Sequence, residues 1–210
     1  MLGKLILTRH GESVMNARGV WTGITDAPLT DKGRRQAAQM GEAIADVIPS
    51  AGFSSALIRA QDTLKIALAA IKLDIPLEFT PALNERDYGD LTGLNKWDVQ
   101  KKYGNEKFTQ WRRSWNYPVP GGETLENVSS RSLPYFEQHI LPLLTTGKTV
   151  IITAHGNTLR ALIKNFDNID DKSVESLEIP FGQIVLYDFD ANGSPGNKSI
   201  RQIETTPTNA

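Results

Sequence analysis

TVIITAHGNTLRALIKNF, residues 149–166, joins the clearest strand of the chain to a helix. Residues 149–154 are β-branched or apolar throughout, which is typical of a strand buried on both faces. The strand ends at His155 and Gly156. Apolar side chains then recur at helical spacing, at Leu159, Leu162, Ile163 and Phe166. A buried strand followed at once by a helix predicts one unit of an α/β sheet.

The same pattern occurs near the N-terminus, where residues 4–8 form a short apolar run that predicts a second buried strand. The run ends in residues with turn character, Arg9-His10-Gly11-Glu12-Ser13. Sites in α/β sheets lie beyond the carboxyl ends of the strands. His10 and His155 each follow a strand, so we expect both in one site.

The rest of the pattern completes the fold class. We expect helices at 30–47 (capped by Thr30 and ended before Pro49), 60–71, 97–115 and 125–144, further strands near Phe53 and at 184–187, and loop with short helix at 83–96. Strands that alternate with helices predict an α/β protein: a three-layer α/β/α arrangement around a mostly parallel sheet. The polar tail from Ile203 is expected to fray.

Composition excludes several classes of function. The 210 residues suit a single domain, 1–210. The net charge of -1 argues against a nonspecific nucleic-acid binder. The chain contains no cysteine, which excludes thiolate nucleophiles and Cys-ligated zinc. No apolar run has the length of a membrane span, and the N-terminal run is too short for a signal peptide. We therefore expect a cytoplasmic protein without membrane partners.

Arg9 and His10 suggest phosphoryl chemistry. A neutral imidazole is a competent nucleophile toward phosphorus when its other ring nitrogen donates to a fixed acceptor. A backbone carbonyl in the turn at Gly11 is a suitable acceptor. The guanidinium of Arg9 presents a planar fork to phosphate oxygens. The alternative is a core or helix-capping histidine beside a surface arginine.

Two further residues fit the same chemistry. Arg59 lies near a strand-to-helix junction, where helix amides also favour anions; alone, it would more often be a solvated surface charge. His155 would stabilise the charge of a transferring phosphoryl group if it were protonated, or it caps the following helix. His139 lies in an amphipathic stretch, and we interpret it as structural.

A phosphoryl transfer also needs a proton for the departing oxygen. Glu12 and Glu85 are the candidates, and we favour Glu85 as general acid and later base. Two arginines and a second histidine can stabilise the transition-state charge without magnesium. The chain has no Walker loop, and its histidines lack metal-ligand spacing. We therefore predict no metal.

With these residues in place, the chain resembles the histidine phosphatase superfamily and, more narrowly, the shorter 2,3-bisphosphoglycerate-dependent phosphoglycerate mutases. The resemblance runs from about Leu5 to Tyr187. Its motifs are Arg9-His10-Gly11-Glu12, Thr22-Gly23, Arg59, residues 83–96 (LNERDYGDLTGLNK), Trp111-Arg112-Arg113-Ser114 and residues 155–162 (HGNTLRAL). It implies a phosphoglycerate mutase-like fold with residues 83–124 inserted as a cap over the substrate.

The resemblance also implies roles for residues. His10 would carry the phosphoryl group, Glu85 would exchange the proton, and Arg9, Arg59 and His155 would hold the phosphoryl group. The implied substrate-binding residues are Arg9, His10, Ser13, Asn16, Thr22, Gly23, Arg59, Glu85, Tyr88, Lys96, Arg112, Arg113, Gly156 and Asn157. The enzyme would be primed by 2,3-bisphosphoglycerate and would interconvert 3- and 2-phosphoglycerate in glycolysis and gluconeogenesis, as a monomer or homodimer.

Two alternatives remain open at this point. Lys96, Arg112 and Arg113 exceed what one phosphate needs, and they suit the second phosphate and carboxylate of bisphosphoglycerate. They equally suit a basic surface helix. A histidine-dependent phosphomonoesterase on the same scaffold is therefore the main alternative, and a silent phospholigand-binding module is the other. Met15, Asp87 and Phe181 depart from the mutase pattern, and we expect Asp87 to place a negative charge near the anion site and so to alter its affinity.

Overall fold

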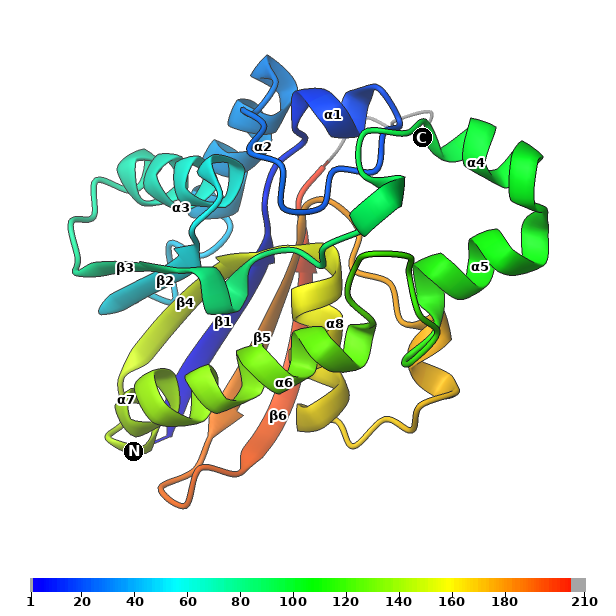
Figure 1. Ribbon diagram of the computed structural model, residues 1–210. Coiled ribbons are helices and arrows are strands. Elements are labelled where there is room, and N and C mark those ends of the chain that lie inside the picture. The colour runs from blue at the N-terminus through cyan, green and yellow to red at the C-terminus, as the bar shows by residue number, and fades with distance from the viewer. Residues whose placement is uncertain (1, 205–210) are drawn as a thin grey trace.

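The protein is described by a computed structural model that covers residues 2–204. The tail from 205, where we expected fraying, lies outside the described residues. A six-stranded sheet has the order β3-β2-β4-β1-β5-β6, and only β5 runs against the other strands (Figure 1). The strands are β1 (Gly3–Arg9), β2 (Ala51–Ser55), β3 (Leu77–Thr80), β4 (Thr149–Ala154), β5 (Gln183–Phe189) and β6 (Pro195–Gln202).

Each face of the sheet has its own apolar core, because side chains alternate along the strands. On β1, Leu5 and Leu7 belong to one core and Ile6 to the other. The first core packs against α6 (Leu125–Tyr135), the π-helical turn Phe136–Ile140, α7 (Leu141–Thr145) and α8 (Gly156–Phe166). The second packs against α2 (Asp31–Glu42) and α3 (Ile58–Ala70). The expected three-layer fold with a mostly parallel sheet is confirmed.

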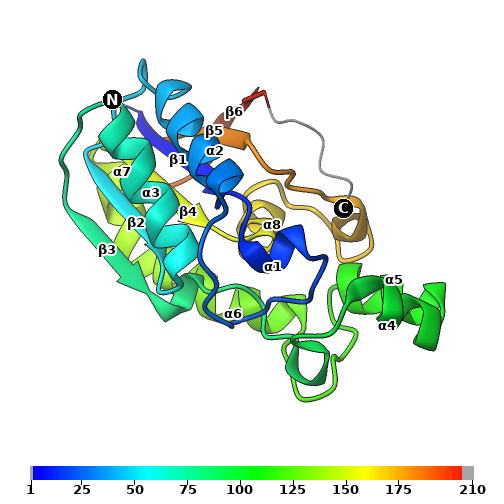
Figure 2. The ribbon, with the colours of Figure 1, turned by 90° about the horizontal axis from the view of Figure 1, so that it is seen from above.

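A smaller unit projects from one end of the sheet (Figure 2). It contains the 3-10 turn Gly89–Leu91 and the helices α4 (Lys96–Tyr103) and α5 (Asn105–Arg113), whereas the 3-10 turn Pro81–Leu83 packs with Leu83 in the first core of the sheet. The separate apolar cluster of the smaller unit includes Trp21, Val99, Phe108 and Trp111. The short helix α1 (Val14–Ala17) and the 3-10 turn Ser173–Ser176 complete the described elements.

Three predicted helices differ from the observed ones. The helix expected to reach Val47 ends at Glu42, and turns follow in which the Ile44 amide donates to the Gly41 carbonyl. The helix expected at 97–115 is broken by Gly104, whose φ of 82° does not fit a helix. The helix expected at 125–144 is interrupted by the π-helical turn, between Pro134 and Pro142. Each proline removes a backbone donor.

Two strands were missed, and both lie at sheet edges. β3 is half-exposed, and β6 is exposed along most of its length and begins with Pro195 and Gly196. Edge strands need no buried face, so they lack the apolar run that marked β1 and β4. No helix within residues 2–204 is both long and apolar enough to cross a bilayer.

Candidate active site

His10 and His155 lie side by side at the carboxyl ends of β1 and β4. These strands pair in parallel, with Arg9 opposite Ala154. The amide of His10 donates to the Ala154 carbonyl at 3.0 Å. The two imidazole centroids are 4.9 Å apart, and both rings are buried. The sheet topology therefore places two residues 145 positions apart in one site.

The hydrogen bonds of His10 leave its Nε2 as the nucleophilic nitrogen. Nδ1 lies 2.6 Å from the Gly11 carbonyl, which can only accept, so Nδ1 carries the proton. Nε2 accepts from Arg59 Nε at 3.3 Å. Burial and the neighbouring charges of Arg59 and Arg9 hold the pKa of His10 well below its usual value. The ring is therefore neutral at physiological pH.

The turn that carries His10 is fixed by close backbone packing. A Cβ on Gly11 would lie 2.3 Å from the Gly33 carbonyl oxygen, and one on Gly33 would lie 2.1 Å from the Glu12 carbonyl oxygen. Only glycine at both positions lets the start of α2 approach this turn. The Gly11 amide also donates to Thr63 Oγ1 at 3.0 Å.

Two arginines flank the nucleophile. Arg59 is fully buried and donates to the carbonyls of Thr25 and Gly23, both at 2.8 Å. Burial lowers the pKa of Arg59 to about 10, so it remains a cation. Arg9 donates to the Ile179 carbonyl at 2.9 Å and stacks over the Phe181 ring. The buried Arg9 Nε has no partner within the described structure.

His155 is held differently from His10. Its Nε2 lies 2.7 Å from Ser55 Oγ, and its buried Nδ1 has no partner among the described residues. Burial, Arg59 and the adjacent His10 lower the pKa of His155 well below its usual value. The ring is neutral in this structure, so it offers hydrogen bonding and not the positive charge considered from the sequence.

The structure separates the two candidate acids. Glu85 Oε1 accepts from the amides of Arg86 and Asn157 and from Asn157 Nδ2, at 2.8, 3.2 and 3.1 Å. Glu85 also lines the cleft beside His10. Glu12 instead accepts from Thr30 Oγ1 at 3.0 Å and pairs with Lys32 at 3.7 Å. Glu12 thus supports the start of α2, and Glu85 faces the cleft.

Two adjoining hollows form the cleft. The larger has a volume of about 390 Å³ and the smaller, which includes His10, about 60 Å³. Five residues line both hollows: Arg9, Trp21, Glu85, Tyr88 and Lys96.

Cations crowd the larger hollow. Burial and the nearby charges of Arg112 and Arg9 lower the pKa of Lys96 to about 8. Burial and the charge of Arg113 lower the pKa of Arg112. Arg113 forms an ion pair with Glu178 at the edge of the hollow. Each positive charge raises the free energy of its neighbours' charged forms. A bound anion of high charge would remove this repulsion, so the arrangement is suited to binding one.

Comparison with known proteins agrees with this geometry. The family model of the histidine phosphatase superfamily (branch 1) matches residues 5–198. The 2,3-bisphosphoglycerate-dependent phosphoglycerate mutase 2 of Gloeobacter violaceus is 46% identical, over 90% of this chain and 87% of its own. The corresponding mutase of Parvibaculum lavamentivorans is 42% identical, over 93% of this chain and 95% of its own. The chain belongs to the histidine phosphatase superfamily and to its phosphoglycerate mutase family.

A solved structure of the superfamily shares the fold. YhfR of Bacillus stearothermophilus superposes with a TM-score of 0.79 at 26% identity, covering 92% of this chain and 94% of that one. The similarity covers nearly the whole of both chains, so it includes the sheet that carries His10 and His155.

Most of the site residues expected from the superfamily motifs come together. Those that line one or both hollows are Arg9, His10, Asn16, Thr22, Gly23, Arg59, Glu85, Tyr88, Lys96, Arg112, Arg113, Gly156 and Asn157. Two do not. Ser13 caps α1 and bonds Asn16, and His155 lies behind the cleft wall against His10.

Six residues that line this mutase-family cleft were not predicted: Val20, Trp21, Arg160, Glu178, Ile179 and Pro180. Arg160 is buried and donates to Asn157 Oδ1 at 2.9 Å, the Arg113 carbonyl at 2.7 Å and the Val174 carbonyl at 2.8 Å. It therefore ties α8 to the end of α5. Its position within HGNTLRAL was the available signal, but helical spacing alone does not separate it from a surface arginine.

Asp87 does not act as expected from its departure from the mutase pattern. Its Oδ1 accepts from the Gly89 amide at 2.8 Å, and the residue lines a separate hollow with Glu123 and Arg131. The carboxylate is thus used in a turn outside the two hollows of the cleft. Phe181, another departure, covers Arg9 with its ring. Within residues 2–204, no three His, Asp or Glu side chains are grouped to hold a metal ion.

Proposed function

We propose that this chain interconverts 3-phosphoglycerate and 2-phosphoglycerate through a phosphohistidine at His10, primed by 2,3-bisphosphoglycerate. The observation that carries the proposal is the pair of cation groups around one cleft. Arg9 and Arg59 flank the nucleophile, and Lys96, Arg112 and Arg113 lie beyond them. A monoesterase needs only the first group. Relatives at 40–46% identity that bear the mutase name support the same conclusion.

The residues fit 2,3-bisphosphoglycerate. Arg9 Nε and Arg160 Nε are buried donors without partners in the described part of the chain. Buried polar groups are rarely left unpaired unless a ligand or water completes them. A ligand with two phosphates and a carboxylate would satisfy these donors and the crowded cations. When bound, it supplies the phosphoryl group that primes His10.

His10 Nε2 attacks the phosphorus in line with the departing oxygen. Arg59 and Arg9 stabilise the charge on the equatorial oxygens, which is the main contribution a protein makes to this reaction. His155 packs against the His10 ring and supports its orientation from behind the cleft wall. Gly11 holds the proton on Nδ1, so Nε2 keeps its lone pair throughout the approach.

Glu85 exchanges the proton. As the bond from phosphorus to the substrate oxygen breaks, Glu85 donates its proton to that oxygen. In the reverse transfer, the carboxylate removes a proton from the hydroxyl that attacks the phosphohistidine. Asn157 and Tyr88 hold the carboxyl in place: Asn157 Nδ2 donates to Glu85 Oε1 at 3.1 Å and contacts the Tyr88 hydroxyl at 2.8 Å.

The remaining expectations belong to the same proposal. Residues 83–124 act as the cap that carries Lys96, Arg112 and Arg113. The enzyme works in glycolysis and gluconeogenesis in the cytoplasm, as a monomer or homodimer.

The test is turnover of 3-phosphoglycerate coupled through enolase, with and without trace 2,3-bisphosphoglycerate. Released phosphate is counted in parallel, and His10→Ala is the matched inactive variant. We expect strong activation by bisphosphoglycerate, loss of at least about 10³-fold in His10→Ala, and little free phosphate. Phosphate release without isomerisation would instead identify a phosphomonoesterase. Binding without an acid-labile phosphoenzyme would identify a binding module.

A further inference from the structure

Glu85 lies in a segment with no regular secondary structure. The 3-10 turn Pro81–Leu83 ends just before it, and the next turn begins at Gly89. A helix or strand would fix its backbone through a ladder of hydrogen bonds, and this segment has none. Asn157 holds the Glu85 carboxyl directly, but the position of the Glu85 backbone depends on whatever else holds residues 82–87.

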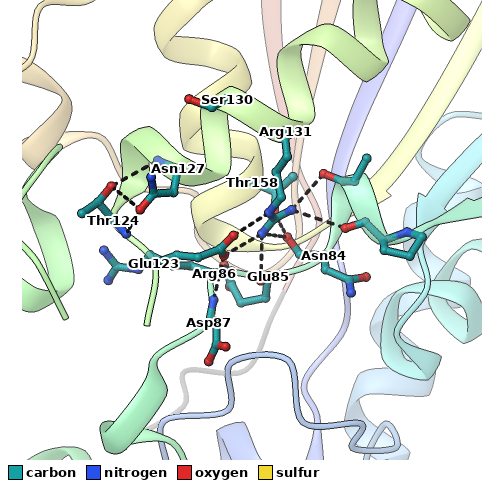
Figure 3. Close-up of polar contacts among 12 residues, drawn as sticks. Asn84, Glu85, Arg86, Asp87, Glu123, Thr124, Asn127, Ser130, Arg131 and Thr158 are labelled. Carbon is teal, nitrogen blue, oxygen red and sulfur yellow. Dashed lines mark hydrogen bonds and ion pairs between the residues drawn. The ribbon is translucent and has the colours of Figure 1, made fainter. Parts of the chain in front are cut away.

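Arg131 on α6 points its guanidinium at this segment (Figure 3) and lines a hollow separate from the cleft. Its Nη1 donates to the Ala82 carbonyl at 2.8 Å. Its Nη2 donates to the carbonyls of Asn84 at 2.9 Å and Glu85 at 3.1 Å. With a longer contact from Nη1 to the Pro81 carbonyl at 3.4 Å, one rigid guanidinium thus contacts four carbonyls, one of them from Glu85 itself.

Glu123 completes the arrangement. Arg131 Nε donates to Glu123 Oε1 at 2.8 Å and Nη2 to Oε2 at 3.0 Å, which is a bidentate ion pair. Glu123 Oε2 also accepts from the Asp87 amide at 2.9 Å. Burial opposes ionisation of Glu123, yet these hydrogen bonds hold its pKa below the usual value. The ion pair therefore hydrogen-bonds to the backbone on both sides of Glu85, at Asn84 and at Asp87.

We propose that the Arg131–Glu123 ion pair positions Glu85 for proton transfer to the departing oxygen. Neither residue lines the cleft; both line the separate hollow that also contains Asn84 and Asp87. They are positioning residues and touch no substrate. The inference rests on the proposed function, because it assigns Glu85 the role of general acid.

Phosphoryl transfer to His10 depends on the position of Glu85 only when the departing oxygen needs a proton. The lone pair of His10 Nε2 forms the N–P bond, the P–O bond breaks with its electron pair going to oxygen, and Glu85 gives that oxygen its proton. An alkoxide, as from phosphoglycerate, is a poor leaving group and needs the proton. A 4-nitrophenolate is stable as an anion and does not. If Glu85 is displaced, transfer from a substrate with an alkoxide leaving group should therefore slow, and transfer from 4-nitrophenyl phosphate should not.

The experiment compares these two leaving groups in Arg131→Gln. Phosphorylation of His10 is followed by rapid quench with 2,3-bisphosphoglycerate, and by the burst of 4-nitrophenolate with 4-nitrophenyl phosphate. We expect the first rate to fall at least tenfold and the second to change less than twofold. KM for 3-phosphoglycerate should stay within about twofold. In a Glu85→Gln background, Arg131→Gln should cause little further loss, because both act through one proton.

Arg201→Gln is the matched control. Arg201 also forms a bidentate ion pair, with Asp46, and donates to the Ala43 carbonyl at 2.6 Å. It lines neither hollow of the cleft. We expect it to leave both phosphorylation rates within twofold. Glu123→Gln keeps an acceptor for the Asp87 amide, so it should show a smaller loss in the same direction as Arg131→Gln.

Equal losses with both leaving groups, or no loss with either, would overturn the positioning role. Failure of the proposed function is a different result: the wild type would release phosphate from 3-phosphoglycerate without isomerising it. Thermal unfolding of each variant separates both results from simple loss of the fold.

Discussion

Lys96 is a partly buried cation whose charge is opposed by its surroundings. Its pKa is lowered to about 8 by burial and by Arg112 and Arg9. Protonated Lys96 favours an anionic ligand, so affinity is complete below pH 8 and is lost as the pH rises through that value. Arg59 and Arg160, with pKa values lowered to about 10, stay mostly charged to pH 9.

We therefore expect 3-phosphoglycerate to bind about tenfold more weakly at pH 9 than at pH 7, because the protonated fraction of Lys96 falls by about that factor. Calorimetric titration of the His10→Ala variant measures this without turnover. Lys96→Arg keeps its charge over this range, so its affinity should change less than twofold. An equal decline in both proteins would place the titrating group elsewhere.

At the same scale, the sequence indicated which residues line the cleft better than it indicated what holds them. His10, Arg59 and Glu85 were expected in one site from their motifs, and they line one hollow. Arg131 and Arg160 act through backbone carbonyls of other segments. Every residue has a backbone carbonyl, so the residue types that accept these hydrogen bonds carry no signal. Nothing in the sequence therefore separates these arginines from solvated ones.

The hairpin of α4 and α5 places three cations over the cleft from its two ends. Lys96 begins α4, and Arg112 and Arg113 end α5. Phe108, on α5, packs edge-on against Trp21 with centroids 5.8 Å apart, and Arg112 lies over its ring. The ring thus joins the hairpin to the loop that forms the cleft wall.

Phe108→Ala should lower the free energy of unfolding by about 3 kcal/mol and weaken 3-phosphoglycerate binding about tenfold, because the cations lose their fixed positions. The burst of 4-nitrophenolate should change less than twofold, since His10 and Arg59 lie on the sheet side of the cleft. Denaturant unfolding, titration and the burst measure these effects. The control Phe166→Ala empties the main core at the end of α8. It should lower stability similarly and leave affinity unchanged; equal loss of affinity in both variants would contradict this role for the hairpin.

Elements were predictable where they are buried. β1 and β4 carry continuous apolar runs, and each was found within a residue of its predicted bounds. Gly104, Pro134 and Pro142 are visible in the sequence as helix-breaking residues. The helical spacing of apolar side chains continues across them, so the sequence predicted unbroken helices. β3 and β6 depend on pairing with a neighbour that the local sequence does not encode.

Across the whole molecule, the sheet buries two histidines beside two arginines. Burial and those charges lower the pKa of both His10 and His155 well below 6.5. The unfolded chain has no such environment, so its histidines take up protons near pH 6.5. Between that pH and the lower folded-state pKa, the unfolded state binds more protons than the folded one. Stability must then fall as the pH falls.

Each histidine contributes up to about 1.3 kcal/mol between pH 7 and pH 5.5, so the free energy of unfolding should drop by as much as about 2.5 kcal/mol over this range. Urea unfolding at pH 7.0, 6.5, 6.0 and 5.5 measures the drop before most carboxylates titrate. His155→Gln should remove about half of it. His139 is exposed and stacks on Tyr135, so His139→Gln should follow the wild-type curve. A flat curve in the wild type would mean that the folded and unfolded histidines take up protons at the same pH, so burial and the two arginines would not extend the neutral form of His10 to lower pH.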